Sequence, residues 1–337
     1  MGTGVRVARL PFRLQQTPLM ASNRPAYRIL SESQYLPVQS RAFWWDATCG
    51  EEGWDAVLLR DKEGECLAAM PYCIERKWGL RFLRSAPWAT YGGIYLKPQA
   101  SDRLYRQQAF EQQMSRGLLE HLPAADVLHF NFHPSWREVS AFRQMGAHAL
   151  CRTTYVFDAG VDAAVIHRQM ASSVRNHLRK ARREGLSIEE GRDVTAFCTL
   201  LERTLGSKVL RAAGGCDSLV RLHLALLQHQ SGLLLDARAL SGKLLAACLL
   251  VWDEHCLHFL LSAQNEEGRR LRAMYLLIWE SIKLAARKGL AFDFNGSMLP
   301  AVEPVFRNFG ARRQTYVELL WGRSLIGRLG VGMRLMR

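Results

Sequence analysis

The sequence predicts an α/β protein made of two tandem domains, each a mixed β-sheet flanked by helices. Three observations predict this fold. Apolar runs surround polar turns that contain glycine, which is typical of β-hairpins. Amphipathic helices follow these runs, and the same elements then occur a second time in the same order. The chain's 337 residues also exceed what one typical hydrophobic core holds.

The hairpin and the helix each occur twice. "VLLRDKEGECLAAMPYCIE" (57–75) predicts a hairpin in the first half, and "LLLDARALSGKLLAACLLVWDEHCLHFLLSA" (233–263) predicts its counterpart. Each hairpin precedes an amphipathic helix, over 102–121 and 269–288. Each helix in turn precedes a strand rich in aromatic residues, "DVLHFNFHP" (126–134) and "LAFDFNGSM" (290–298).

Short sequence motifs also occur twice. "FRQMGA" (142–147) is matched by "FRNFGA" (306–311), and "TTYVF" (153–157) is matched by "QTYVE" (314–318). Several matches in one order favour a duplication over chance similarity. We therefore expect four regions: a basic, disordered arm over 1–25, a first domain over 26–160, a second domain over 161–321 and a basic amphipathic tail over 322–337.

A basic stretch opens the second copy. In "SSVRNHLRKARREGL" (172–186), Val174, Leu178 and Ala181 share one helical face, whereas arginines occupy the opposite face. The stretch is therefore half of an amphipathic helix that packs on a sheet, and a dedicated polyanion grip is the weaker interpretation.

Positive charge is concentrated at the two ends. The net charge is +14, and residues 1–28 and 319–337 hold nine arginines and no acidic residue. Nucleic-acid or anionic-membrane-surface binding by an inactive scaffold is the alternative to an enzyme. In the tail, Leu325, Ile326, Leu329 and Met333 predict an interfacial helix and a peripheral membrane contact.

Length and composition predict the location and state of the protein. No stretch has the roughly 20 apolar residues that a membrane span needs, so we expect a cytoplasmic monomer, at most peripheral to the inner membrane. The start of the chain is open between Met1 and Met20, and the first residues lack the apolar core of a signal peptide.

Cysteine and histidine usage predicts neither disulfides nor a metal. The eight cysteines are scattered without a CxxC pair, which is typical of reduced core thiols. His129 and His133 share one face of a strand without a third ligand in view, so we expect structural roles for both. We predict no bound cofactor.

Two segments carry a resemblance to a known family. The basic helix "RNHLRKARREGL", the hairpin after it and "GLAFDFNGSMLPAVEPVFRNFGARRQTYVEL" resemble the FemAB-like branch of the GNAT acyltransferase superfamily, whose members contain two GNAT domains in tandem. The resemblance covers about residues 27–321. It implies transfer of an acyl or aminoacyl group to an amine, with the donor held in the second domain between splayed strands over 256–263 and 291–295. The first domain is then non-catalytic and lies on the acceptor side.

The donor is open between acyl-CoA and aminoacyl-tRNA. The coenzyme A loop of GNAT enzymes is reduced here to Gly268, and the helical arm of the tRNA-dependent members is missing. A helix that begins near Gly268 offers unpaired N–H groups to a phosphate, and Arg269, Arg270 and Arg272 add positive charge. Arg175 and Arg179 of the basic helix face either the same phosphates or water.

The strand end "FDFNGS" supplies the candidate catalytic residues. Asp293 and Asn295 point to the same side of the strand. Asp293 accepts or orients the proton of the attacking amine, or both residues cap the next turn. Tyr316 donates a proton to the leaving group, or its ring packs in the core.

No nucleophile paired with a base is signalled, so we expect direct attack without a covalent enzyme intermediate. In "PWATYGGIYL" (87–96), Tyr91, Gly92 and Gly93 line an acceptor groove or form a β-bulge. The expected acceptor is an amine, either a small molecule or a lipid-linked cell-envelope precursor.

Overall fold

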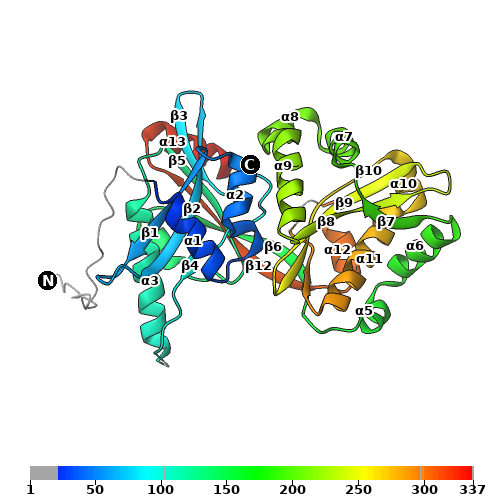
Figure 1. The fold of residues 1–337 in the computed structure, drawn as a ribbon, viewed down its shortest axis with the longest axis horizontal. Helices are drawn as coiled ribbons and strands as arrows, with labels where there is room; N and C mark the ends of the chain where they lie inside the picture. Colours follow the sequence, from blue (N-terminus) through cyan, green and yellow to red (C-terminus); the bar gives the residue numbers. More distant parts are fainter. Residues whose placement is uncertain (1–21, 102, 297, 299, 336–337) are drawn as a thin grey trace.

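The computed structural model describes residues 22–101, 103–296, 298 and 300–335, so most of the predicted arm lies outside the described residues. Its central feature is a mixed β-sheet that runs through both halves of the chain (Figure 1). Helices cover both faces of this sheet in the view of Figure 1.

In the first half, the predicted hairpin and the predicted long helix are present. The strands are β1 (Trp54–Arg60), β2 (Cys66–Lys77), β3 (Leu80–Arg84), β4 (Tyr95–Leu96), β5 (Val127–Phe132) and β6 (His148–Phe157). The helices are α1 (Arg24–Ser33), the 3-10 turn η1 (Val38–Ser40), α2 (Ala42–Cys49), α3 (Leu104–His121) and α4 (Ser140–Gln144).

The second half repeats this order of elements and adds helices before it. Its strands are β7 (Ser187–Gly191), β8 (Gly232–Arg238), β9 (Leu244–Trp252), β10 (Cys256–Gln264), β11 (Ala291–Asp293) and β12 (Arg312–Gly322). Its helices are α5 (Ala163–Gln169), α6 (Ser172–Arg183), α7 (Val194–Leu205), α8 (Ser207–Ala212), α9 (Gly215–Gln228), α10 (Glu266–Leu271), α11 (Ala273–Lys288), α12 (Glu303–Asn308) and α13 (Leu325–Leu335).

The helix predicted over 269–288 is interrupted. Arg272 has a left-handed backbone, with φ of 65°, which separates the six-residue helix α10 from the long helix α11. A non-glycine residue in this conformation breaks helical hydrogen bonding. The long helix therefore begins at Ala273, and not near Gly268 as the sequence predicted.

Each half completes the sheet of the other. The strand order is β1-β2-β3-β5-β12-β6-β11-β10-β9-β8-β7, with β4 paired to β2. The last strand of the first half, β6, pairs with β11, whereas the last strand of the chain, β12, pairs with β5. These two strands also pair with one another, antiparallel, from Arg312 opposite Val156 to Leu320 opposite His148. A cut at residue 160 would thus separate strands that share one ladder.

The amphipathic pattern of the basic helix is confirmed in α6. Val174, Leu178 and Ala181 are buried, and Arg179 is exposed. The buried residues belong to a core around α11 that also includes Phe292 and Phe294.

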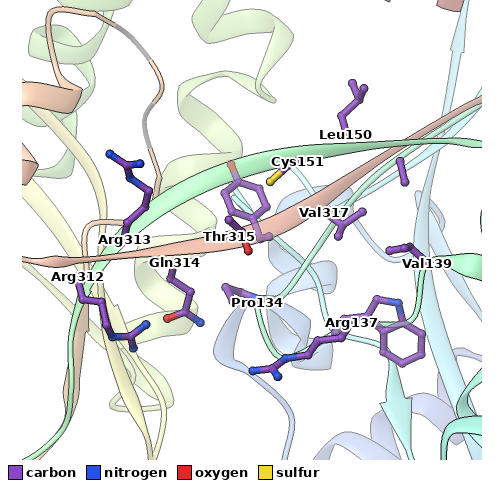
Figure 2. A pocket seen from close by; sticks show the side chains of 13 residues that line it. Pro134, Arg137, Val139, Leu150, Cys151, Arg312, Arg313, Gln314, Thr315 and Val317 are labelled. Atoms are coloured by element: carbon purple, nitrogen blue, oxygen red, sulfur yellow. The ribbon is translucent and has the colours of Figure 1, made fainter.

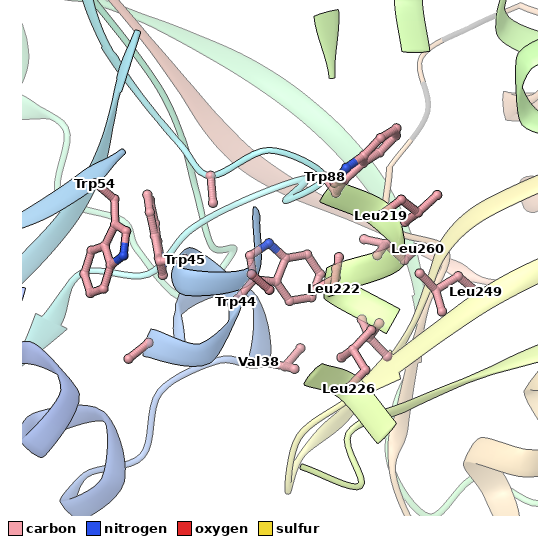
Figure 3. Packing of buried hydrophobic residues seen from close by; sticks show 14 of the residues in the cluster. Val38, Trp44, Trp45, Trp54, Trp88, Leu219, Leu222, Leu226, Leu249 and Leu260 are labelled. Atoms are coloured by element: carbon pink, nitrogen blue, oxygen red, sulfur yellow. The ribbon is translucent and has the colours of Figure 1, made fainter. Parts of the chain in front are cut away.

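A second core joins the two halves. Trp44 and Trp88 of the first half pack with Leu219, Leu222 and Leu226 of α9, as Figure 3 shows. Trp44 is 0% exposed. An apolar interface of this kind resembles a domain core, so it favours fixed positions of the halves over hinged ones.

Candidate active site

The candidate active site lies where β10 and β11 part. The parallel register of these strands ends with His258 opposite Asp293, but β10 continues to Gln264. A register shift between Phe259 and Leu261 marks a bulge in β10 just beyond this point. A bulge removes peptide groups from the regular ladder, and such groups can bind a carbonyl oxygen that becomes negative during a reaction.

The chain turns sharply after β11. Asn295 and Gly296 have left-handed backbones, with φ of 61° and 80°. Asp293 Oδ1 accepts the N–H of Asn295 at 2.7 Å, and the hydroxyl of Thr154 accepts the N–H of Gly296 at 2.8 Å. Asparagine and glycine are the residues that adopt this conformation at the lowest cost. Asp293 therefore caps the turn.

The carboxylate of Asp293 is enclosed by donors. The hydroxyls of Tyr91 and Thr154 both donate to it, and His258 Nδ1 lies 3.6 Å from Oδ2. Burial alone would raise the pKa of this carboxyl, but His258, Thr154 and Tyr91 hold it below its usual value. Asp293 is therefore ionised at neutral pH, and its side chain is 4% exposed.

Cys256 and His258 extend this cluster along β10. One side-chain atom each of Cys256, His258 and Asp293 lie within 4.8 Å of one another. Burial opposes charge on His258, yet Cys256 and Asp293 raise its pKa well above the usual value. Burial raises the pKa of the Cys256 thiol. These residue types bind transition metals elsewhere, but here the carboxylate is already engaged by three hydrogen-bond donors.

Asn295 links the two halves of the molecule. Its amide group donates to the hydroxyl of Thr90, and its Oδ1 accepts from Gln39 Nε2 at 3.1 Å. Gln39 Oε1 in turn accepts the N–H groups of Thr90 and Tyr91 at 2.7 and 3.2 Å. Asn295 is 5% exposed, so its side chain fixes the first half against the turn after β11.

The stretch predicted to line the acceptor groove contributes to the same contact. Tyr91 is 1% exposed and reaches Asp293. The N–H of Gly92 donates to the carbonyl of Asn131 at 2.8 Å, and the N–H of Gly93 donates to the hydroxyl of Ser40. Neither glycine N–H is thus available to a ligand in this conformation.

A groove beside the cluster contains Tyr316. It has a volume of about 660 Å³ and is lined by β6, β12 and the segment over 134–139 (Figure 2). The ring of Tyr316 lies 5.0 Å from the ring of Tyr91, edge to face, and a Cβ on Gly296 would stand 3.2 Å from the Tyr316 hydroxyl. Through its contact with the Tyr91 ring, Tyr316 therefore connects the groove with the buried carboxylate of Asp293. Burial raises the pKa of its hydroxyl to about 12.

The groove is positively charged. Arg137, Arg312 and Arg313 are among its lining residues, and its lining contains no acidic side chain in the part of the chain that the structure describes. In Figure 2, Arg313 points to the other side of β12 from Arg312. Arg312 is paired with Asp158 at 2.8 Å outside this lining. The groove is suited to a substrate that bears a carboxylate or phosphate.

The predicted phosphate-binding residues fall into two groups. Gly268 is buried, its N–H donates to Asn265 Oδ1 at 2.8 Å, and a Cβ there would stand 2.4 Å from the carbonyl of Leu245, so it serves packing. Arg269 and Arg270 are exposed on α10. A short helix in which the N–H groups of Gly268 and Arg269 already donate to Asn265 offers little to an anion.

Arg272 lies closer to the basic helix. It immediately precedes the first turn of α11, its Nε is buried, and no partner for that atom is found in the described residues. The rings of His177 and Tyr275 are 4.5 Å apart, which places α6 against the first turn of α11. Burial, Arg272 and Lys180 together lower the pKa of His177. Arg179 lines a surface hollow of α6 with Lys180, whereas Arg175 bonds the carbonyl of Met170.

Sequence reasoning missed five residues of the cluster: Cys256 and His258 on β10, and Gln39, Thr90 and Thr154. A signal existed for His258, because a histidine inside the apolar run "CLHFLL" stands two positions from Cys256 and shares its face. The other three come from distant segments, and periodicity within one element carries no information about such contacts. The ring of His129 forms a hydrogen bond with the carboxylate of Glu318, and the ring of His133 forms one with the hydroxyl of Ser135.

Comparison with known proteins shows what the chain is similar to. Residues 168–301 match the acetyltransferase (GNAT) domain family, a segment that includes α6, the parted strands and Asp293. This part of the chain is similar to GNAT domains, and the chain as a whole has a fold similar to those of FemX and a tandem GNAT protein. No curated protein matches the sequence significantly.

Three solved structures document the fold. FemX has a TM-score of 0.61 at 11% identity, and the alignment covers 88% of this chain and 96% of FemX. A tandem GNAT protein from the clavulanic acid biosynthesis pathway has a TM-score of 0.51 at 11% identity, and the alignment covers 88% of this chain and 93% of that protein. L-PGS from Bacillus licheniformis has a TM-score of 0.52 at 10% identity, and the alignment covers 92% of this chain and 96% of L-PGS. No helix among the described residues has the length and hydropathy needed to cross a membrane.

Proposed function

We propose that the protein transfers an acyl or aminoacyl group from a thioester or ester donor to an amine. The observation that carries the proposal is the position of Tyr316, which lines a basic groove and packs against the Tyr91 ring whose hydroxyl binds Asp293. The site thus combines a gap between parted strands for the donor with an adjoining groove for the acceptor.

The donor's phosphates bind between α6 and the first turn of α11. Arg272 provides a buried Nε without a partner in the described residues, and Arg179 and Lys180 add charge at the surface of α6. The unpaired N–H groups that open a long helix suit an anion. Either acyl-CoA or aminoacyl-tRNA satisfies this arrangement, and neither leaves a resident cofactor on the enzyme.

In the reaction, a neutral amine attacks the donor's carbonyl carbon directly. Peptide N–H groups at the β10 bulge stabilise the negative charge that develops on the carbonyl oxygen. The Tyr316 hydroxyl gives its proton to the departing sulfur or oxygen and receives the proton that the amine loses. A hydroxyl with a pKa of about 12 remains protonated over the physiological range, which suits this role.

Asp293 acts as a positioning residue in this scheme. Its oxygens hold Tyr91 and Thr154 and cap the turn at Asn295, so it does not reach the amine in this conformation. The basic lining of the groove favours an amine that also bears a carboxylate or phosphate, as small metabolites and lipid-linked cell-envelope precursors do.

The first test is donor binding followed by turnover. The melting temperature of the purified protein is measured with acetyl-CoA, with other acyl-CoA thioesters and with charged tRNA, and the donor that raises it is used with a panel of amines. Tyr316→Phe is expected to lower kcat by about a hundredfold with little change in melting temperature. Tyr72→Phe removes the same hydroxyl from β2, outside the site, and is expected to have no effect.

The proposal fails if no donor of either class stabilises the protein. It also fails if Tyr316→Phe and Tyr72→Phe are equally active. Salt-sensitive RNA binding without any transfer would support the alternative, a binding protein on an inactive GNAT scaffold.

A further inference from the structure

The final helix presents its large apolar residues to solvent. Leu325, Ile326, Leu329 and Met333 of α13 are 78%, 63%, 70% and 64% exposed. The face that packs on the sheet contains small residues instead, with Gly327 and Val331 buried. This is the reverse of the usual arrangement for a helix on a protein surface, because larger apolar side chains normally provide the buried stripe.

The inverted helix is firmly attached to the body of the protein. Val331 packs with Val127 and Leu320, and a Cβ on Gly327 would stand 2.2 Å from the carbonyl of Asp126. Arg334 pairs with the buried carboxylate of Glu318 at 2.6 Å. The exposed residues of α13 are therefore held in place as a fixed surface feature.

Trp78, in the turn between β2 and β3, is a further exposed apolar residue at this end of the sheet. Phe82 of β3 is paired with Val127, and Val127 is paired with Gly322, the residue that ends β12 just before α13. The β2–β3 turn projects from this edge and carries Trp78, which is 83% exposed with Lys77 over its ring. Figure 1 shows α13 and the β2–β3 hairpin at the same end of the molecule.

We propose that this end docks on an anionic lipid bilayer. The docking surface consists of Trp78, Leu325, Ile326, Leu329 and Met333. Charge complementarity favours a bilayer over a second protein, because exposed Arg76, Lys77 and Arg328 flank the apolar residues and residues 319–335 contain no acidic residue. Tryptophan settles at the headgroup level, and leucine, isoleucine and methionine enter the acyl boundary. Basic residues beside such a surface attract anionic headgroups.

Docking by this end is independent of the reaction proposed above. The surface lies on the β2–β3 turn and on α13, and none of its residues belongs to the Asp293 cluster or the groove. The inference is therefore tested by membrane binding alone, and it does not depend on which group the enzyme transfers.

The test is sedimentation of the full chain with lipid vesicles. Vesicles of phosphatidylglycerol and phosphatidylcholine in equal amounts are compared with vesicles of phosphatidylcholine alone, at about 0.1 M and about 0.5 M NaCl. We expect binding to the anionic vesicles that weakens at the higher salt concentration. The double variant Ile326→Glu, Leu329→Glu is expected to bind at least about tenfold more weakly, because glutamates oppose both the apolar and the electrostatic contribution.

A matched control keeps the result specific. Leu240 lies in the β8–β9 turn of the second half and is 85% exposed, so Leu240→Glu adds the same charge away from the docking surface. It is expected to bind vesicles as the unaltered chain does, and all variants are expected to keep its melting temperature. The proposal is overturned if the unaltered chain does not sediment with anionic vesicles, or if Leu240→Glu weakens binding as much as the double variant. The proposal would also be overturned if light scattering showed that the unaltered chain is a dimer, that only the double variant is a monomer, and that the unaltered chain does not bind vesicles.

Discussion

Glu318 offers the sharpest test of how the sheet is held together. This carboxylate on β12 is 2% exposed and lies among Arg152 of β6, Arg334 of α13 and His129 of β5. Burial would raise its pKa, but His129 and Arg152, with Arg334, lower it from 4.5 to about 2. The ionised form is therefore favoured strongly in the folded protein.

The lowered pKa sets the size of the effect. Each step of one in pKa corresponds to about 1.36 kcal/mol, so a fall of about 2.5 gives roughly 3 kcal/mol of folding free energy. Because the pKa is lower in the folded state, this stability is fully present above about pH 4.5. It is lost as the pH falls toward about 2, and roughly half remains at about pH 3.

The perturbation is Glu318→Gln, which keeps the shape of the side chain and removes its charge. We expect the free energy of unfolding, measured in urea, to fall by about 3 kcal/mol at neutral pH and the difference from the unaltered chain to shrink below about pH 4.5. Glu254→Gln is the control, since Glu254 is 59% exposed and pairs with Arg41 at the surface. It should cost less than about 1 kcal/mol. Equal losses in the two variants, or a Glu318→Gln loss that does not depend on pH, would refute the reasoning.

Three further predictions concern the site and the contact between halves. Gly296→Ala places a Cβ 3.2 Å from the Tyr316 hydroxyl at a φ of 80°, so it should cost about 1–2 kcal/mol in urea unfolding and also lower turnover; unchanged turnover would contradict the placement of Tyr316. Asp293→Asn removes the charge and replaces one of the two oxygens that accept from the Tyr91 and Thr154 hydroxyls with an NH2 donor, so it should cost about 3 kcal/mol in the same assay, whereas a variant as stable as the unaltered chain would exclude the positioning role. Trp44→Ala opens a cavity between the halves and should cost about 3–5 kcal/mol in calorimetry with one transition retained, and two separate transitions would show that the halves fold independently.

The order of elements was predictable from the sequence because it depends on local patterns. Hairpin turns and helical spacing are set by residues a few positions apart. The predicted strand alternation of Asp293 and Asn295 was wrong, because β11 ends at Asp293 and Asn295 has a left-handed backbone in the turn that follows. The amphipathic face of α6 followed from the spacing of Val174, Leu178 and Ala181, and the structure confirms it. The break at Arg272 was not visible, because an arginine in the left-handed region has no compositional signature.

The strand order and the Asp293 cluster were not predictable in this way. Pairing of β12 with β5 and of β6 with β11 is decided by which sheet edges meet in space. Likewise Gln39 and Thr154 reach the turn after β11 from segments more than a hundred residues away. Such contacts depend on register, and a single sequence reports register only within one hairpin.

The exchanged strands have a consequence for synthesis of the chain. Because β12 lies between β5 and β6, the middle of the sheet closes only after residues 312–322 have left the ribosome. Until then β5 and β6 each present an unpaired edge, which is the form of β-structure most prone to pairing with other chains. The nascent first half therefore depends on the last strand of the chain, and a ribosome that stops after α12 would release a product with two open edges.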